Sequence, residues 1–235
     1  MSAKHAAKKV QKALDALPDW LHKWRLSVNV AKTQALISGN AAPPPPLTLF
    51  GKDVAWQPHV TYLGVKIDRG LRLKTHVDSV VQAVKTAKGR LRPVLSSSLP
   101  LKTKLGIYKT YIRSRLTYAA PAWYAYVAET YRRRLRAQEN QSLRDIVGAP
   151  RYVRNATIQR DLKWEGLDAF ISRLASDMFG RADRSAHPHL VGIAPLHARP
   201  PDRRHWPSPR EAVITASTTA GAAPAAPVDP AGRPN

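Results

Sequence analysis

Apolar side chains at helical spacing open the chain. Between residues 2 and 24, positions three or four apart are apolar: Val10, Leu14, Leu17, Leu21 and Trp24. This period is typical of an amphipathic helix whose apolar stripe faces a core. Pro18 lies inside the pattern and lacks a backbone N–H, so the sequence predicts a kink or a restart of the helix there.

Alternating apolar residues then predict short strands. Residues 26–30 alternate between apolar and polar side chains, and residues 36–37 continue the predicted strand. The run 41–46 (AAPPPP) excludes a helix or a central strand and predicts an extended spacer. Apolar positions within 47–56 predict a hairpin with its turn at residues 51–53.

The next stretch predicts a second hairpin and a helix start. Apolar and aromatic residues at 60–67 lead to the turn signal Asp-Arg-Gly at 68–70, and a second alternating run follows at 71–73. A helix is expected to begin at Thr75. Gly64 falls inside the first predicted strand, where a missing side chain marks a bulge or the close approach of another backbone or a ligand. An ordinary packing glycine is the alternative.

From residue 77 onward the spacing of apolar positions becomes helical. The first apolar stripe comprises Val77, Val80, Val84, Ala87 and Leu91. The second comprises Leu101, Leu105, Tyr108, Ile112 and Leu116. Pro93 is expected to end the first of these helices, and Pro100 to stand near the start of the second.

Further helices follow an aromatic cluster around Pro121. We expect this cluster to be core between helices, with stacking on exposed bases as the alternative; it comprises Tyr118, Trp123, Tyr124 and Tyr126. The basic run 132–136 begins a helix that continues to Gly148, and we interpret it as a basic helix edge, with a localisation signal as the alternative. Residues 157–182 predict one or two more helices, separated at Gly166.

These elements predict an α+β fold that is mostly helical. The expected domains are 1–76, 77–150, 151–185 and 186–235. The last is expected to be a disordered Pro/Ala-rich tail, because ten of the twenty prolines fall between Pro188 and Pro234. No zinc site is expected there, since its histidines lack cysteine or paired carboxylates as neighbours; they are His187, His189, His197 and His205.

The charge of the chain points to its partner. Lysine and arginine total 38 against 16 acidic residues, a net charge of +22, and residues 72–136 alone hold 15 basic and two acidic residues. Because such an excess repels itself unless a polyanion lies against it, nucleic acid is the first partner expected, and an anionic membrane surface the second. The sequence shows neither an apolar run of membrane-spanning length nor the apolar core of a signal peptide. The absence of cysteine fits an intracellular protein.

Two sequence blocks resemble a known family. The block from Trp20 to Thr33 contains KW-x-L-x-V-N-x-x-K-T, and the block from Tyr62 to Asp68 reads YLGVKID. With the basic helical region behind them, they resemble the C-terminal half of the reverse transcriptases of jockey-like non-LTR retrotransposons, as far as residue 190. The resemblance implies a palm remnant with a primer-grip hairpin in the first domain, a helical thumb in the second and a C-terminal helical extension in the third.

The resemblance also implies roles for individual residues. The expected partner is an RNA–DNA or DNA primer-template duplex, with no membrane involved. The residues expected to bind it are Tyr62, Leu63, Gly64, Lys74, Lys85, Lys88, Arg92, Lys102, Lys104, Lys109, Arg113 and Arg115. Lys32 matches a palm lysine that in related polymerases would donate a proton to the departing pyrophosphate, a role that here would be vestigial. An exposed strand-end lysine is the alternative.

The catalytic acids of the family are not found. The 235 residues contain no Asp-Asp pair, whereas two-metal nucleotidyl transfer needs carboxylates to hold its ions. We therefore expect a fragment or truncated element copy that holds no cofactor, does not extend a primer alone and acts in the nucleus with the missing N-terminal half; the intact family enzyme uses magnesium. One alternative is a non-enzymatic basic nucleic-acid-binding module derived from a mobile element. Another is a product that does not fold stably, because half a palm leaves a sheet edge unpaired.

Overall fold

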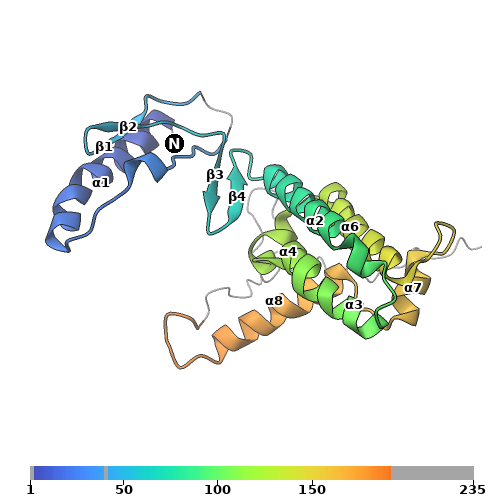
Figure 1. The fold of residues 1–235 in the computed structure, drawn as a ribbon. Coiled ribbons are helices and arrows are strands. Elements are labelled where there is room, and N and C mark those ends of the chain that lie inside the picture. Colours follow the sequence, from blue (N-terminus) through green and yellow to red (C-terminus); the bar gives the residue numbers. More distant parts are fainter. Residues whose placement is uncertain (1–2, 40–41, 192–235) are drawn as a thin grey trace, which may run out of the picture. The chain divides into compact units, whose positions relative to one another are not determined.

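A computed structural model describes residues 3–39 and 42–191 of the protein (Figure 1). The chain divides into two compact units, Met1–Val80 and Val81–Asn235. Helices predominate, and the strands form two separate two-stranded antiparallel sheets, so the mostly helical α+β prediction is confirmed. Within the part of the chain that the structure describes, no helix is long and apolar enough to cross a membrane. The predicted disordered tail, 186–235, lies outside the described residues from position 192 onward.

The first unit packs a helix against a small hairpin. Helix α1 (Ala3–Lys23) is one continuous helix that includes Pro18. It lies beside strand β1 (Leu47–Leu49), which pairs with β2 (Lys52–Val54) (Figure 1). The core at this contact consists of buried Ala35, Leu47, Leu49 and Val54, against which Ala7, Leu14 and Leu17 of α1 pack. Two members of the predicted apolar stripe do not face this core, since Val10 is 46% and Trp24 is 61% exposed.

A glutamine of α1 fixes the helix to the strand. The Gln11 side chain donates from Nε2 to the Thr48 carbonyl oxygen (2.9 Å) and accepts at Oε1 from the Thr48 backbone N–H (2.8 Å). Both backbone groups of an edge-strand residue are thereby satisfied by one side chain, which limits the helix to a single register on the sheet.

The strand predicted for residues 26–30 does not form. Residues Val30–Lys32 instead make a short 3-10 turn, η1, and the Asn29 side chain accepts a hydrogen bond from the Lys32 backbone N–H (3.2 Å). Thr33 Oγ1 donates back to the Asn29 carbonyl oxygen (3.2 Å). These local side-chain bonds satisfy the backbone without a strand partner, so the Asn-x-x-Lys-Thr pattern has a structural role of its own.

The second hairpin forms, but its turn lies earlier than predicted. Strand β3 (His59–Tyr62) pairs with β4 (Val65–Asp68), and the two-residue turn between them is Leu63-Gly64, with φ angles of 46° and 82°. Positive φ at both central residues is what the tight hairpin turn of type I′ requires. Gly64 is therefore a turn glycine, and the interpretation of it as a glycine inside a strand was wrong. The predicted strand at 71–73 is absent; these residues lead directly into the next helix.

The first hairpin turns in the same way. Phe50 and Gly51 have φ angles of 51° and 69° and join β1 to β2. The predicted hairpin is thus confirmed, with its turn one residue ahead of the predicted 51–53. In both hairpins a bulky residue occupies a left-handed position that glycine, asparagine or aspartate would adopt more readily.

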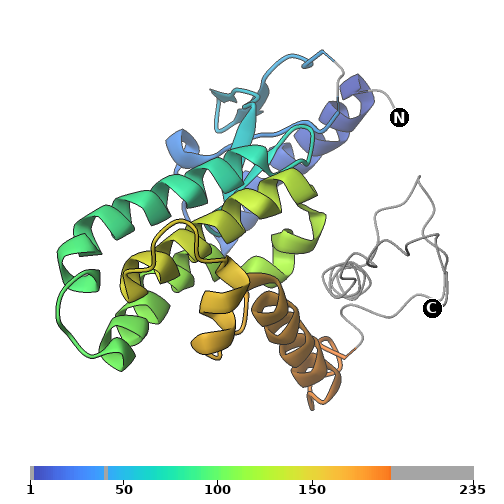
Figure 2. The ribbon, with the colours of Figure 1, turned by 90° about the vertical axis from the view of Figure 1, so that its right-hand side faces the viewer.

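The second unit is a helical bundle. Helix α2 (Lys74–Leu95), which begins in the first unit, and helix α6 (Glu129–Val147) run side by side in Figures 1 and 2. An ion pair between Lys88 Nζ and Asp145 Oδ2 (3.4 Å) joins them. Helix α2 continues through Pro93 to Leu95, so the expectation that Pro93 ends this helix was wrong by two residues.

The next predicted helix contains a wider turn. Helix α3 (Leu101–Tyr108), the π-helical turn η2 (Lys109–Arg113) and helix α4 (Ser114–Thr117) follow one another directly. Because a π turn holds more residues than an α turn, it rotates every later side chain about the helix axis. Tyr108, Ile112 and Leu116 are fully buried, as predicted, whereas Leu101 is 44% exposed.

The remaining helices close the core. Trp123 and Tyr124 are buried, which confirms the core interpretation for these two aromatics, while Tyr118 is 57% exposed. Gly148, with a φ of 64°, caps the C-terminus of α6, and Gly166 directly precedes α8, where a separation was predicted. The elements are α5 (Ala120–Trp123), η3 (Tyr124–Tyr126), α7 (Asn155–Asp161) and α8 (Leu167–Asp183).

Candidate nucleic-acid interface

The tip of the β3–β4 hairpin presents apolar side chains to solvent. Tyr62 is 65% exposed and Leu63 is 74% exposed. The hairpin below the tip is held by two side chains from other segments: the Thr61 N–H donates to Gln34 Oε1 (2.9 Å), and the Lys66 N–H to His76 Nδ1 (3.3 Å). The branched Leu63 keeps a left-handed φ at a steric cost. An exposed apolar tip on an anchored hairpin is suited to contact with a partner.

The basic face of α2 is partly free and partly engaged. Lys74, Lys85 and Arg92 are exposed. Lys88 lies between them on the same helix but is half-buried, because its ammonium group pairs with Asp145 and lies 3.5 Å from Gln141 Oε1. The exposed members can approach a phosphate without breaking an internal contact, whereas Lys88 already has a structural role.

The lysines of α3 differ among themselves in the same way. Lys102 and Lys109 are exposed, and Lys109 Nζ lies 5.4 Å from the centre of the Trp164 ring. Lys104 is half-buried, with Nζ 3.5 Å from the Ile146 carbonyl oxygen. Arg115 is exposed on α4 and donates to the Tyr111 carbonyl oxygen, a neutral partner that leaves its charge uncompensated.

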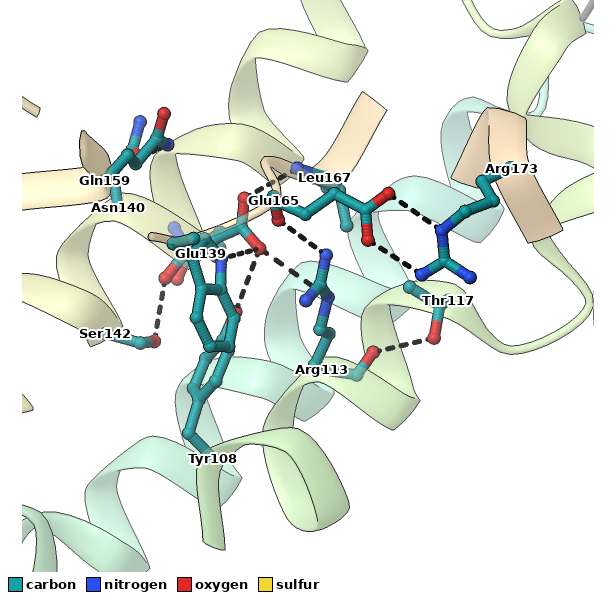
Figure 3. A network of polar contacts seen from close by, with 12 residues as sticks. Tyr108, Arg113, Thr117, Glu139, Asn140, Ser142, Gln159, Glu165, Leu167 and Arg173 are labelled. Carbon is teal, nitrogen blue, oxygen red and sulfur yellow. Dashed lines mark hydrogen bonds and ion pairs between the residues drawn. The ribbon is translucent and has the colours of Figure 1, made fainter. Parts of the chain in front are cut away.

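Arg113 lies inside the bundle. It is 6% exposed, and it donates from Nη2 to the Glu165 carbonyl oxygen (2.8 Å), while Nε lies 3.8 Å from Glu139 Oε1 (Figure 3). Its guanidinium also stacks on the rings of Trp164 and Phe170, 4.8 and 3.9 Å from their centres. Burial lowers the pKa of Arg113, and the neighbouring Glu139 carboxylate counteracts this. The structure therefore separates Arg113 from the exposed residues with which the sequence grouped it.

Glu139 of α6 is the partner that the sequence analysis missed. It is 1% exposed and accepts hydrogen bonds from the Leu167 backbone N–H (2.8 Å), Trp164 Nε1 (3.2 Å) and the Tyr108 hydroxyl (3.4 Å) (Figure 3). Burial raises its pKa, and the Arg113 guanidinium acts in the opposite direction. One carboxylate thus joins α3, α6 and the start of α8.

A signal for this carboxylate exists in the sequence. Glu139 lies midway between Leu135 and Leu143, four residues from each, and all three face the core of the bundle. An acidic residue on an apolar helix face needs a buried partner, so the pattern could have predicted a buried ion pair, though not that Arg113 is its basic member.

Lys32 lies exposed at the end of η1, where its backbone N–H is capped by Asn29. In the described part of the chain, no group of three or more histidine, aspartate or glutamate side chains is placed to hold a metal ion.

Comparisons with known proteins give one consistent answer. The chain is 30% identical over 202 residues to the RNA-directed DNA polymerase from mobile element jockey of Drosophila funebris, a match that covers 83% of this chain and 22% of the relative. It is 28% identical over 185 residues to the jockey polymerase of Drosophila melanogaster, covering 77% of this chain and 20% of that protein. It is 27% identical over 217 residues to the probable RNA-directed DNA polymerase from transposon X-element of Drosophila melanogaster, covering 91% and 24%.

No family model and no solved structure matches the chain. The chain spans less than a quarter of the length of the curated relatives it matches. The matches nevertheless extend over most of its own residues, including the helical unit and the hairpin unit. The chain is thus homologous to one segment of the RNA-directed DNA polymerases of jockey-type non-LTR retrotransposons.

Proposed function

We propose that this chain is the part of a non-LTR reverse transcriptase that holds the primer-template duplex. In this proposal residues 1–76 supply the end of the palm and the primer grip, residues 77–150 the thumb, and residues 151–185 a helical extension. The observation that supports it best is the large excess of positive over negative charge in residues 72–136. Residues 72–136 contain 15 basic and two acidic residues, and ten of the basic side chains are exposed. Phosphates are the partner that such a surface stabilises.

The hairpin adds a second kind of contact. Its exposed tip, Tyr62 to Gly64, offers apolar surface to a sugar or base at the end of a primer strand, while the basic helices hold the phosphate backbone. Contacts of this type position a duplex and do not read its sequence, so the proposed binding is independent of sequence.

The proposal assigns no bond-making step to this chain alone. Its sequence has no Asp-Asp pair, and the two metal ions of nucleotidyl transfer need such carboxylates. The N-terminal part of a polymerase would supply these carboxylates, which would hold the magnesium ions. Lys32, exposed on η1, would then be available to donate a proton to pyrophosphate. A nuclear location belongs to the same proposal, because chromosomal DNA is found there.

Duplex binding measured against salt tests the proposal. A fluorescent primer-template duplex is titrated with the full chain and with a triple variant in which the exposed Lys85, Arg92 and Lys102 become glutamine. We expect the plot of log affinity against log salt to lose about 0.9 in slope for each phosphate contact removed. The matched control replaces three other exposed basic residues, Arg160, Arg181 and Arg184, with glutamine. Equal effects of the two triple variants would reject the proposed surface in favour of general charge attraction.

A basic module that binds nucleic acid only through its helices is the second candidate. The two are distinguished by Leu63→Asn. This change removes the more exposed of the two apolar side chains at the tip but creates Asn-Gly, the pair that a type I′ turn prefers, so the hairpin itself should become more stable. A primer grip predicts weaker binding to a duplex with a recessed 3′ end and unchanged binding to a closed duplex without ends. The second candidate predicts no change with either duplex.

A further inference from the structure

A groove on α6 is lined by residues other than the twelve that the sequence assigned to the duplex. Its volume is about 460 Å³, and four arginines, two asparagines and a glutamine line it together with one alanine; no carboxylate is among the lining residues. The lining residues are Arg133, Arg136, Ala137, Asn140, Gln141, Arg144, Arg151 and Asn155. None of them is among those twelve residues, although Arg133 and Arg136 belong to the basic stretch 72–136.

The helical repeat of α6 explains how this groove arises. The lining positions between Arg133 and Arg144 follow one another at intervals of three, one, three, one and three residues, so they share one face of the helix. The opposite face, with Leu135, Glu139 and Leu143, is buried in the bundle. The groove face of α6 carries no large apolar side chain, so burial against an apolar core would not stabilise it.

Arginine 144 shapes one end of the groove. Its guanidinium donates to the carbonyl oxygens of Pro150 and Val153, the latter at 2.8 Å, and to Asn155 Oδ1 at 2.7 Å. These bonds hold the loop between α6 and α7 against the helix. Because all three acceptors are neutral, the charge of Arg144 is not compensated by them.

The loop held in this way projects an aromatic ring into solvent. Tyr152 follows Arg151 directly and is 86% exposed, the highest value among the exposed large apolar and aromatic side chains of the described residues. Arg151 and Arg154, on either side of it, are exposed as well. A tyrosine ring kept almost entirely in water beside two cations is a ready stacking platform for a base.

Two of the groove arginines have a different role. Arg136 pairs with Glu129 and with Asp168 Oδ2 (2.7 Å), and Arg133 Nε lies 3.3 Å from Glu129 Oε1. Their charges are therefore partly neutralised within the bundle. The charge that no carboxylate neutralises lies at the Arg144 and Arg151 end of the groove. The Arg144 guanidinium is engaged with the loop and contributes its charge, whereas the exposed Arg151 is suited to bind phosphate oxygens directly.

We propose that the α6 groove binds a single strand of nucleic acid, with the exposed Arg151 on a phosphate, the charge of Arg144 beside it, and Tyr152 stacked on an unpaired base. A single strand is favoured over a duplex because stacking on an exposed ring needs a base that has left its own stack. RNA and DNA strands share the phosphates and base faces that this groove recognises. The inference stands independently of the duplex-binding function, since it uses other residues.

The test uses fluorescence anisotropy with the full chain and labelled (rU)12, (dT)12 and a closed DNA duplex. Tyr152→Ala should weaken binding of a single strand by about 5- to 100-fold, because stacking of one base is lost. Tyr152→Phe keeps the ring and should bind like the original protein. Tyr111→Ala removes another exposed tyrosine, 53% exposed on η2, and serves as the matched control. Affinity for the closed duplex should be the same in all three variants.

Charge is tested separately with Arg151→Gln, which should lower the salt slope for single strands by about 0.7. Arg181→Gln, an exposed arginine of α8, is its control. Equal affinity of Tyr152→Ala and the original protein for both oligonucleotides would overturn the proposal, as would equal effects of the two arginine changes. The triple variant of Lys85, Arg92 and Lys102 should lose duplex binding and keep its binding of single strands. This result would support a single-strand site separate from the duplex surface. A preference for (rU)12 over (dT)12, or the reverse, would identify which kind of strand the groove takes.

Discussion

Removing the carboxylate of Glu139 should strongly destabilise the helical unit. In Glu139→Leu the Arg113 guanidinium loses its counter-charge, and three donors from Leu167, Trp164 and Tyr108 lose their acceptor. Removing one member of a buried ion pair costs about 3–5 kcal/mol, because the other charge stays buried without compensation. Typical domains have only about 5–15 kcal/mol of stability in total, so this change alone would remove a large share of it.

The reciprocal change should cost less. In Arg113→Met the carboxylate of Glu139 keeps its three hydrogen-bond donors, so its charge remains partly stabilised. Without the guanidinium, the pKa of Glu139, already raised by burial, should rise further. A carboxyl group whose folded pKa is raised contributes stability that is complete below its ordinary value of 4.5 and is lost as the pH rises through the folded pKa. The stability that Arg113→Met loses relative to the original protein should therefore be smaller at about pH 5 than at about pH 8.

Urea unfolding followed by circular dichroism at 222 nm measures both effects, with the double variant completing a cycle. We expect the double variant to lose less stability than the sum of the single changes, because neither charge is then left alone. Arg173→Met is the control, since its ion pair with Glu165 (2.7 Å) is exposed to solvent and should add little to stability. A loss below about 1 kcal/mol in Glu139→Leu would refute the reasoning, because it would mean that the carboxylate is not an essential acceptor.

Three further predictions concern the first unit. Burial, with the charge of Lys66 adding to it, lowers the pKa of His76, so its contribution to stability is present above pH 6.5 and should be lost as the pH falls through the folded pKa; urea unfolding should show this, and His76→Leu should remove the pH dependence. Leu63→Asn should raise the melting temperature measured by circular dichroism, and a fall would contradict the turn assignment. Gln11→Ala should lose about 0.5–1.5 kcal/mol in urea unfolding, because the exposed backbone groups of Thr48 exchange the Gln11 side chain for water; hydrogen exchange at the Thr48 amide reports the same contact directly.

The sequence predicted the helices well because their signal is long. The stripe through Tyr108, Ile112 and Leu116 repeats over several turns and is buried as expected. Capping glycines at 148 and 166 also marked real boundaries. Repetition of this kind outweighs local irregularities, as α1 and α2 show by continuing through their prolines.

The turns were harder because the residues that form them are not turn formers. Leu63 and Phe50 adopt positive φ values that leucine and phenylalanine seldom take, so the Asp-Arg-Gly segment at 68–70 gave the stronger signal. That segment does turn, but between β4 and α2 rather than between two strands. Pairing of β3 with β4 decides the conformation of Leu63, and such a tertiary effect has no local sequence mark.

Arg113 was misplaced for a different reason. A regular α-helix would place Arg113 beside Lys102 and Lys109 on a basic edge. The π turn at Lys109–Arg113 holds about one residue more than an α turn, so it rotates the Arg113 side chain about the helix axis. Ile112 and Arg113 therefore both face inward. The buried acid of α6 was the only indication that a basic residue had to enter the core.

The π turn at Lys109–Arg113 also constrains how many residues the segment from α3 to α4 contains, more than it constrains which residues they are. The π turn between α3 and α4 places Ile112 and Arg113 together in the core. A substitution at an exposed position keeps this spacing, whereas deletion of one residue from the turn would rotate the adjoining side chains about the helix axis, and Arg113 would no longer lie 3.8 Å from Glu139. In related sequences, substitutions within Lys109–Arg113 should therefore be tolerated far more often than insertions or deletions.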